Sequence, residues 1–208
     1  IAGMNYDVFF FEAFEEEARL IRQYLPEGIR AGFSNYTIQE YGDQLPAKLI
    51  STRVQSVIPP HWAPDLGGIV SRSTGYEHLL KYQEQTGVAV PSGYLPLYCN
   101  RAVAEHGMML WMALLRKLPR QTAYMRTFKR NGITGLECER KTLLVVGVGH
   151  IGYEVVKIGR GLNMEVLGVD LIHKHPDVDY VTIEEGLQKA DIIVCAMNQT
   201  KKNYGYFS

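Results

Sequence analysis

The sequence predicts an α/β protein built from two doubly wound units, and three observations support this. Short apolar runs alternate with amphipathic segments over about the first 100 residues, which is typical of βαβ units and a parallel sheet. A glycine turn follows a buried apolar run within residues 143–152, and a long apolar helical segment precedes it. We therefore expect a flavodoxin-like domain over residues 1–99, followed by part of a Rossmann domain over residues 100–208.

The first unit is expected to contain short parallel strands joined by helices. Pro26 ends an amphipathic helix that begins at Phe14, and Pro59 and Pro60 break the chain before a short helix. The apolar runs that predict strands are residues 6–13, 29–34, 47–52, 68–71 and 87–90.

The second unit is expected to begin with a helix over residues 102–118. This segment is apolar nearly all round, so it must be covered on most sides, either between two domains or against another subunit. Pro119 interrupts it, and a second helix is expected to run to about Arg130. Beyond these, the pattern predicts helices at residues 151–162 and 183–190 and strands at residues 143–146, 165–169, 179–182 and 191–197.

A glycine pattern, GVGHIG, joins the first of these strands to its helix. Gly147 allows a tight turn, Gly149 leaves room for a pyrophosphate, and Gly152 lets the helix pack closely. Asp170 lies 18 residues beyond Gly152, at the end of the next strand. A carboxylate there accepts hydrogen bonds from ribose hydroxyls and repels a 2′-phosphate. The pattern predicts a dinucleotide site that prefers NAD to NADP, and a glycine turn in an unrelated α/β protein is the alternative.

The composition favours a cytoplasmic protein that acts on small molecules. Lys and Arg together number 22, as do Asp and Glu, so the net charge does not point to nucleic acid or a membrane as partner. Cys99, Cys138 and Cys195 lie far apart without metal-ligand spacing, so we expect reduced thiols and no metal site. The most apolar stretch, residues 107–115, is far short of the roughly 20 residues that a membrane span needs.

Three motifs resemble the D-2-hydroxyacid dehydrogenase family, and D-lactate dehydrogenase-like members in particular. They are SRSTGYEHL at residues 71–79, VAVPSGYLPLYCNRAVAEHG at residues 88–107, and LLVVGVGHIG at residues 143–152 together with Asp170. The resemblance implies an NAD-dependent oxidoreductase that interconverts a D-2-hydroxy acid and a 2-keto acid by hydride transfer. It also implies that residues 1–99 belong to a substrate domain.

The resemblance implies roles for individual residues. Thr74 and Gly75 would present backbone N–H groups to the substrate carboxylate, and Tyr98 would lie at the edge of the cleft. A simple turn and a packing tyrosine are the alternatives. His150 would offer its backbone N–H to the pyrophosphate, whereas His106 is expected to be a structural histidine within a buried helix. Further cofactor contacts would come from Val103, Ile151, Cys195, Ala196 and Met197.

The sequence departs from the family pattern in two respects. Glu77 and Leu80 stand where the related subgroup usually carries aspartates. Family members also take their catalytic arginine, acid and histidine from segments beyond the position of Ser208, so we assign no catalytic residue within this chain and expect it to be part of a longer protein. The family further implies a homodimer that pairs through the helix at residues 102–118.

Two other hypotheses remain open at this point. One is an NAD-sensing binding protein on the same scaffold, similar to the C-terminal-binding-protein corepressors. The other, more distant, is a hydrolase of adenosylated thioethers with a similar nucleotide domain. Balanced charge and the lack of a peptide-groove signature favour the dehydrogenase over the corepressor-like protein.

Overall fold

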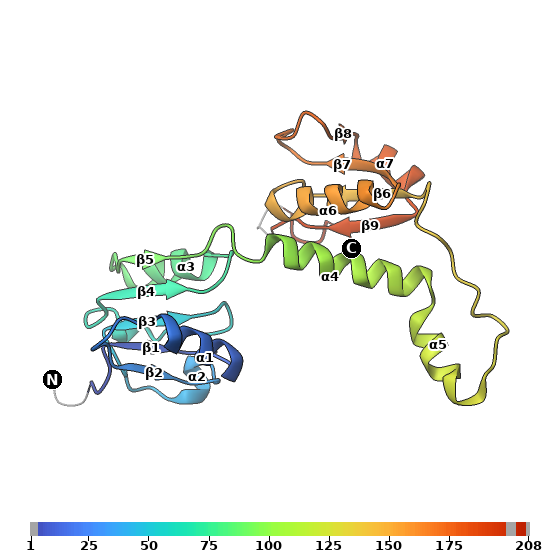
Figure 1. Cartoon of the computed structure of the whole chain (residues 1–208). Coiled ribbons are helices and arrows are strands. Elements are labelled where there is room, and N and C mark those ends of the chain that lie inside the picture. The colour runs from blue at the N-terminus through green and yellow to red at the C-terminus, as the bar shows by residue number, and fades with distance from the viewer. Residues whose placement is uncertain (1–3, 199–202, 207–208) are drawn as a thin grey trace. The chain divides into compact units, whose positions relative to one another are not determined.

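The computed structural model describes residues 4–198 and 203–206. The chain divides into two compact units, Ile1–Tyr98 and Cys99–Ser208. Each unit contains one parallel sheet with its own helices (Figure 1). Among the described residues, no helix has both the length and the apolar character required to cross a membrane.

The first unit is a five-stranded parallel sheet in the order β2-β1-β3-β4-β5. This is the strand order of flavodoxin-like folds, so the predicted fold class is confirmed. Its strands are β1 (Val8–Phe10), β2 (Ala31–Phe33), β3 (Leu49–Thr52), β4 (Gly68–Ser71) and β5 (Ser92–Gly93). Its helices are α1 (Glu15–Tyr24), α2 (Ile38–Tyr41), α3 (Glu77–Thr86) and the short 3-10 helix η1 (Pro60–Trp62).

The last strand of this sheet was predicted in the wrong place. Residues 87–90 do not form a strand, and β5 lies at Ser92–Gly93 instead. Gly87 takes a left-handed conformation, with φ of 68°, and caps the C-terminus of α3. The apolar residues that follow belong to the connection between α3 and β5, where Val90 donates its N–H to the carbonyl of Val88.

The second unit contains a four-stranded parallel sheet in the order β8-β7-β6-β9. Its strands are β6 (Thr142–Val146), β7 (Glu165–Val169), β8 (Asp179–Tyr180) and β9 (Ile192–Cys195). Its helices are α4 (Asn100–Leu115), α5 (Leu118–Tyr124), η2 (Met125–Thr127), α6 (His150–Gly161) and α7 (Ile183–Lys189).

Helices α6 and α7 cover opposite faces of this sheet. A Cβ atom added to Gly159 of α6 would lie 2.6 Å from the side chain of Leu143, and one added to Gly186 of α7 would lie 2.6 Å from that of Leu144. Leu143 and Leu144 are neighbours on β6, so their side chains point to opposite faces. This explains why all five residues of β6 are buried.

Helix α4 is covered on one side by its own unit. That side packs along α6, and only Ala104 and Trp111 of α4 are buried. Leu114 remains 76% exposed, so the cover expected on the other sides, from the other domain or another subunit, stays a prediction. The helix also ends earlier than predicted, because Lys117 takes a left-handed conformation and separates α4 from α5. Phe128, also left-handed, ends η2 before Arg130.

Candidate functional site

The glycine turn between β6 and α6 depends on two glycines for its shape. Gly147 has φ of +91°, and a Cβ atom there would lie 2.7 Å from the backbone nitrogen of Met197. A Cβ atom on Gly152 would lie 1.9 Å from the carbonyl oxygen of Gly147, so only glycine lets α6 approach the turn this closely. Neither position accepts a side chain without moving backbone.

Gly149 is different, because a Cβ atom there would meet no atom within 4 Å. It precedes the first residue of α6, His150, whose side chain is exposed. The backbone N–H groups of a helix's first turn lack partners within the helix and favour an anion. The turn therefore leaves open space at the N-terminus of α6, where an anion is stabilised. This geometry fits a pyrophosphate.

Asp170 connects this turn to the end of β7. Its Oδ2 atom accepts a hydrogen bond of 2.7 Å from the backbone N–H of Val148. Its Oδ1 atom accepts one of 3.1 Å from the backbone N–H of Ile172. The carboxylate thus holds the glycine turn in place, a contact that the sequence pattern did not reveal.

A cavity of about 830 Å³ lies in the second unit, lined by residues of α4, α6 and β9. Most of its lining is apolar, and it includes five of the residues predicted to contact the cofactor: Val103, Ile151, Cys195, Ala196 and Met197. His106 also lines the cavity and is exposed, so the prediction of a buried structural histidine was wrong. The physical reason is that His106 lies on the side of α4 away from the buried Ala104 and Trp111.

In the first unit, Thr74, Gly75 and Tyr98 come together at the carboxyl end of β4. The Thr74 hydroxyl donates a hydrogen bond of 3.0 Å to the carbonyl oxygen of Tyr98. The hydroxyl of Ser73 donates one of 2.8 Å to the carbonyl of Gly75. The turn is therefore held by hydrogen bonds from two side chains. Gly75 itself is not among the glycines with positive φ.

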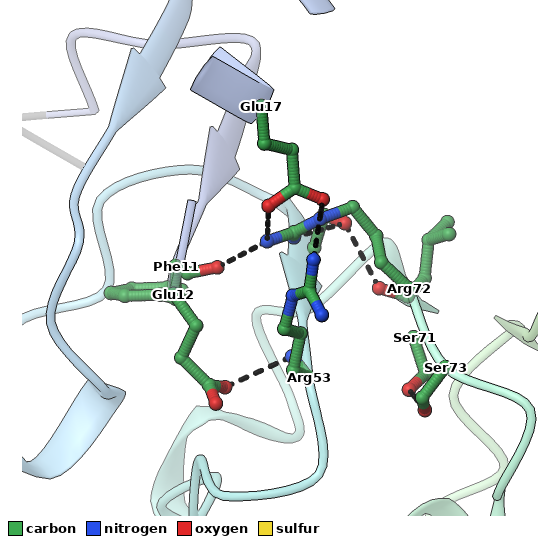
Figure 2. Close-up of polar contacts among 9 residues, drawn as sticks. Phe11, Glu12, Glu17, Arg53, Ser71, Arg72 and Ser73 are labelled. Carbon is green, nitrogen blue, oxygen red and sulfur yellow. Dashed lines mark hydrogen bonds and ion pairs between the residues drawn. The ribbon is translucent and has the colours of Figure 1, made fainter. Parts of the chain in front are cut away.

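Arg72, directly after β4, is 8% exposed and makes hydrogen bonds to three elements (Figure 2). Its Nε donates to Glu17 of α1 over 2.9 Å, and its Nη1 donates to the Ser51 hydroxyl of β3 over 2.9 Å. Its Nη2 donates to the carbonyl oxygen of Phe11, after β1, over 2.7 Å. Arg72 thus fixes the carboxyl ends of three neighbouring strands beside residues 73–75.

Glu17 receives a second guanidinium group, that of Arg53. The Nη2 atom of Arg53 lies 3.2 Å from the same Oε1 atom that Arg72 contacts. Burial would raise the pKa of Glu17, but the guanidinium groups of Arg72 and Arg53 outweigh it and lower the pKa below its ordinary value. This cluster was not predicted from the sequence, where its signal is an arginine directly after each of two neighbouring strands.

Residues 108–208 match the family model of the D-isomer specific 2-hydroxyacid dehydrogenase NAD-binding domain. These residues belong to the D-2-hydroxyacid dehydrogenase family. The second unit is accordingly an NAD-binding domain, which agrees with the open glycine turn and the acid after β7.

Curated relatives support this assignment over different parts of the chain. A 2-hydroxyacid dehydrogenase homolog of Haemophilus influenzae is 33% identical over 146 residues, which are 65% of this chain and 43% of that protein. D-lactate dehydrogenase of Escherichia coli is 31% identical over 65% of this chain and 43% of its own. Glyoxylate reductase of Pyrococcus furiosus is 25% identical over 96% of this chain and 60% of its own. The chain thus spans less than two thirds of each of these relatives.

Solved structures of the same family share the fold. The D-lactate dehydrogenase of Aquifex aeolicus, solved with NAD and lactic acid, has a TM-score of 0.76 and 25% identity, covering 94% of this chain and 62% of its own. The apo D-lactate dehydrogenase of Escherichia coli has a TM-score of 0.81 at 21% identity, covering 97% and 68%.

Proposed function

We propose that the protein containing this chain is an NAD-dependent D-2-hydroxyacid dehydrogenase that interconverts a 2-hydroxy acid and a 2-keto acid. The observation that carries the proposal is the open glycine turn at Gly149, held by Asp170, in a domain that matches this family's NAD-binding model. Relatives named dehydrogenase or reductase favour this function over the corepressor-like alternative.

The glycine turn would hold the pyrophosphate of NAD. Gly149 leaves space for it, and the backbone N–H groups of His150 and Ile151 begin the helix that faces it. Asp170 would bind the ribose, since an ionised carboxylate has about four acceptor positions and two of them serve Val148 and Ile172. A carboxylate here disfavours a 2′-phosphate, so the proposed cofactor is NAD rather than NADP.

The apolar cavity beside the turn would receive the less polar parts of the cofactor. Val103 and Ile151 would pack against it, and residues 195–197 would line its adenine or ribose side. An apolar lining of this kind excludes water from a bound nucleotide and strengthens the polar contacts at the ends of the nucleotide. NAD, when bound, supplies or accepts the hydride of the reaction.

The turn at the end of β4 would bind the substrate. The backbone N–H groups of Thr74 and Gly75 would hold the carboxylate, and Tyr98 would stand at the edge of the site. These groups bind and orient the acid, and none of them is proposed to donate the proton to the keto oxygen. Arg72 is fully committed to Glu17, Ser51 and Phe11, so we do not propose it as the arginine that polarises the carbonyl.

Assembly and location are further parts of the proposal. The exposed apolar surface of α4 outside the cavity lining, which includes Met109, would pair with a second copy to form a homodimer. Cys138 and Cys195 are free thiols, which favours a reducing compartment, and we propose the cytoplasm. The balanced charge favours a small organic acid as partner over nucleic acid or membrane.

The test is NADH oxidation by the complete gene product with pyruvate and longer 2-keto acids. We expect turnover with at least one of these acids and stereospecific formation of the D-2-hydroxy acid. Tight NADH binding without reduction of any 2-keto acid would contradict the enzyme and favour the corepressor-like function.

A further inference from the structure

A glutamate side chain lies against the turn proposed to hold the substrate carboxylate. A Cβ atom built on Gly75 would lie 3.1 Å from Oε2 of Glu77, the first residue of α3. The carboxylate therefore stands directly beside Gly75, in space that a side chain on Gly75 would need. Glu77 is also one of the two positions at which this sequence departs from the pattern of the family.

The charge of this carboxylate is not compensated by its own unit. Within residues 4–198 and 203–206, the Glu77 carboxylate makes no hydrogen bond and no ion pair, and its side chain is exposed. His78, the next residue, does not neutralise it, because burial lowers the pKa of His78 against the opposing effect of the Glu77 and Glu12 carboxylates. At neutral pH, Glu77 therefore places an unpaired negative charge beside the turn.

The turn has backbone donors that attract an anion. The N–H groups of Gly75 and Tyr76 donate to no atom of the described residues. The first N–H groups of α3, which begins at Glu77, have no partners within the helix. A carboxylate is electrostatically favoured at such a position. Glu77 thus lies beside the same donors that the substrate carboxylate is proposed to use.

Two carboxylates at these donors would repel each other. The repulsion between like charges a few ångströms apart disfavours the binding of a second anion. The Glu77 side chain is exposed and has several rotatable bonds, so it can turn away when an acid binds. Its charge nevertheless remains at the start of α3. An incoming acid therefore has to displace this carboxylate and also bind near it.

We propose that the Glu77 carboxylate competes with the substrate carboxylate for the turn at Thr74 and Gly75, and so sets the affinity of the protein for 2-keto acids. This inference rests on the proposed dehydrogenase function. Glu77 takes no part in the transfer of the hydride or the proton, so its effect falls on the binding of the acid and not on the reaction of the bound acid. Removal of its charge makes the turn a stronger site for carboxylates.

The experiment measures kcat and KM of the complete gene product for pyruvate and 2-oxobutanoate at neutral pH and low salt. Glu77→Gln keeps the size of the side chain and removes its charge. We expect it to lower the KM of each acid by at least about 5-fold and to leave kcat within about 2-fold. Glu77→Ala should lower KM to a similar extent. The inhibition constant of oxamate, which has the same carboxylate but is not reduced, should fall by the same factor.

The matched control is Glu84→Gln, because Glu84 is an exposed glutamate in the last turn of the same helix. It removes the same charge from α3 at a position away from the turn, so KM should not change. An unchanged or higher KM in Glu77→Gln, or an equal fall in Glu84→Gln, would overturn the inference while the dehydrogenase function stood. A complete protein that reduces no 2-keto acid would overturn the proposed function and this inference with it.

Discussion

The Asp170 carboxylate and the Val148 backbone N–H are joined by a hydrogen bond of 2.7 Å that links the end of β7 to the glycine turn between β6 and α6. Val148 follows Gly147 in the turn, and Asp170 follows the last residue of β7. The acid proposed to bind the ribose thus also fixes the backbone proposed to bind the pyrophosphate. Cofactor preference and turn geometry therefore depend on one side chain.

Replacement of Asp170 should weaken NADH binding for two reasons. Asp170→Ala removes both the ribose acceptor and the support of the turn, so we expect affinity for NADH to fall by about 10- to 100-fold. The wild-type protein should bind NADH at least about 10-fold more tightly than NADPH, because the carboxylate repels the added phosphate. Equilibrium fluorescence titration measures both, and equal affinity for the two nucleotides in the wild type would show the assignment to be wrong.

Gly149 and Gly152 form a matched pair for separating binding from folding. Gly149→Val should abolish NADH binding and leave the melting temperature nearly unchanged, because its side chain enters open space. Gly152→Ala should lower the stability by about 3 kcal/mol or more, since its Cβ atom would overlap the carbonyl of Gly147. Calorimetry with and without NADH checks both outcomes. Native NADH affinity in Gly149→Val would rule out the pyrophosphate site.

Loss of Arg72 should destabilise the first unit. Arg72→Met leaves the half-buried Glu17 with only one guanidinium partner and removes hydrogen bonds to Ser51 and Phe11. Leaving buried acceptors without a donor typically costs about 1–3 kcal/mol, and Glu17, which is partly exposed, keeps Arg53 as a partner. Urea unfolding monitored in the first unit measures the loss, and a change below about 1 kcal/mol would contradict the role of Arg72 in holding the strand ends.

The ion pairs of Glu17 with Arg72 and Arg53 also predict that the stability of the first unit depends on pH. The guanidinium groups lower the pKa of Glu17 in the folded protein, so its contribution is complete above its ordinary pKa of 4.5 and is lost as the pH falls through the lowered value. Glu17→Gln should be less stable than the wild type at neutral pH, and the difference should shrink on acidification. Unfolding free energies over an acid pH series test this, and a constant difference would contradict it.

The homodimer can be tested on the exposed face of α4. Met109 is 49% exposed and does not line the cavity, and Met109→Glu should shift the complete protein from dimer toward monomer without loss of the fold, because it places a charge in an apolar contact. Sedimentation equilibrium at micromolar concentration is the measurement. A wild-type protein that is monomeric under these conditions would disprove the dimer.

The sequence by itself determined the fold class, the glycine turn and the acid after β7. These features depend on neighbours along the chain: an apolar run, a turn that needs glycine, and a helix that follows at once. The same reasoning from neighbouring residues placed β5 wrongly. The apolar residues after Gly87 resemble a strand in composition, but they only connect α3 to β5. This reasoning also left open what covers α4, since apolar character on all sides does not say what lies against each side.

Only the tertiary structure decided how the carboxyl edge of the first sheet is arranged. Arg53, Arg72 and Glu17 are separated by up to 55 positions in the sequence, yet their charged groups meet at one oxygen atom. No local pattern marks such a meeting, because it follows from the order in which parallel strands are placed side by side. The turn at Gly149 could be identified from its own residues, whereas the role of Asp170 in holding Val148 required both strands to be in place.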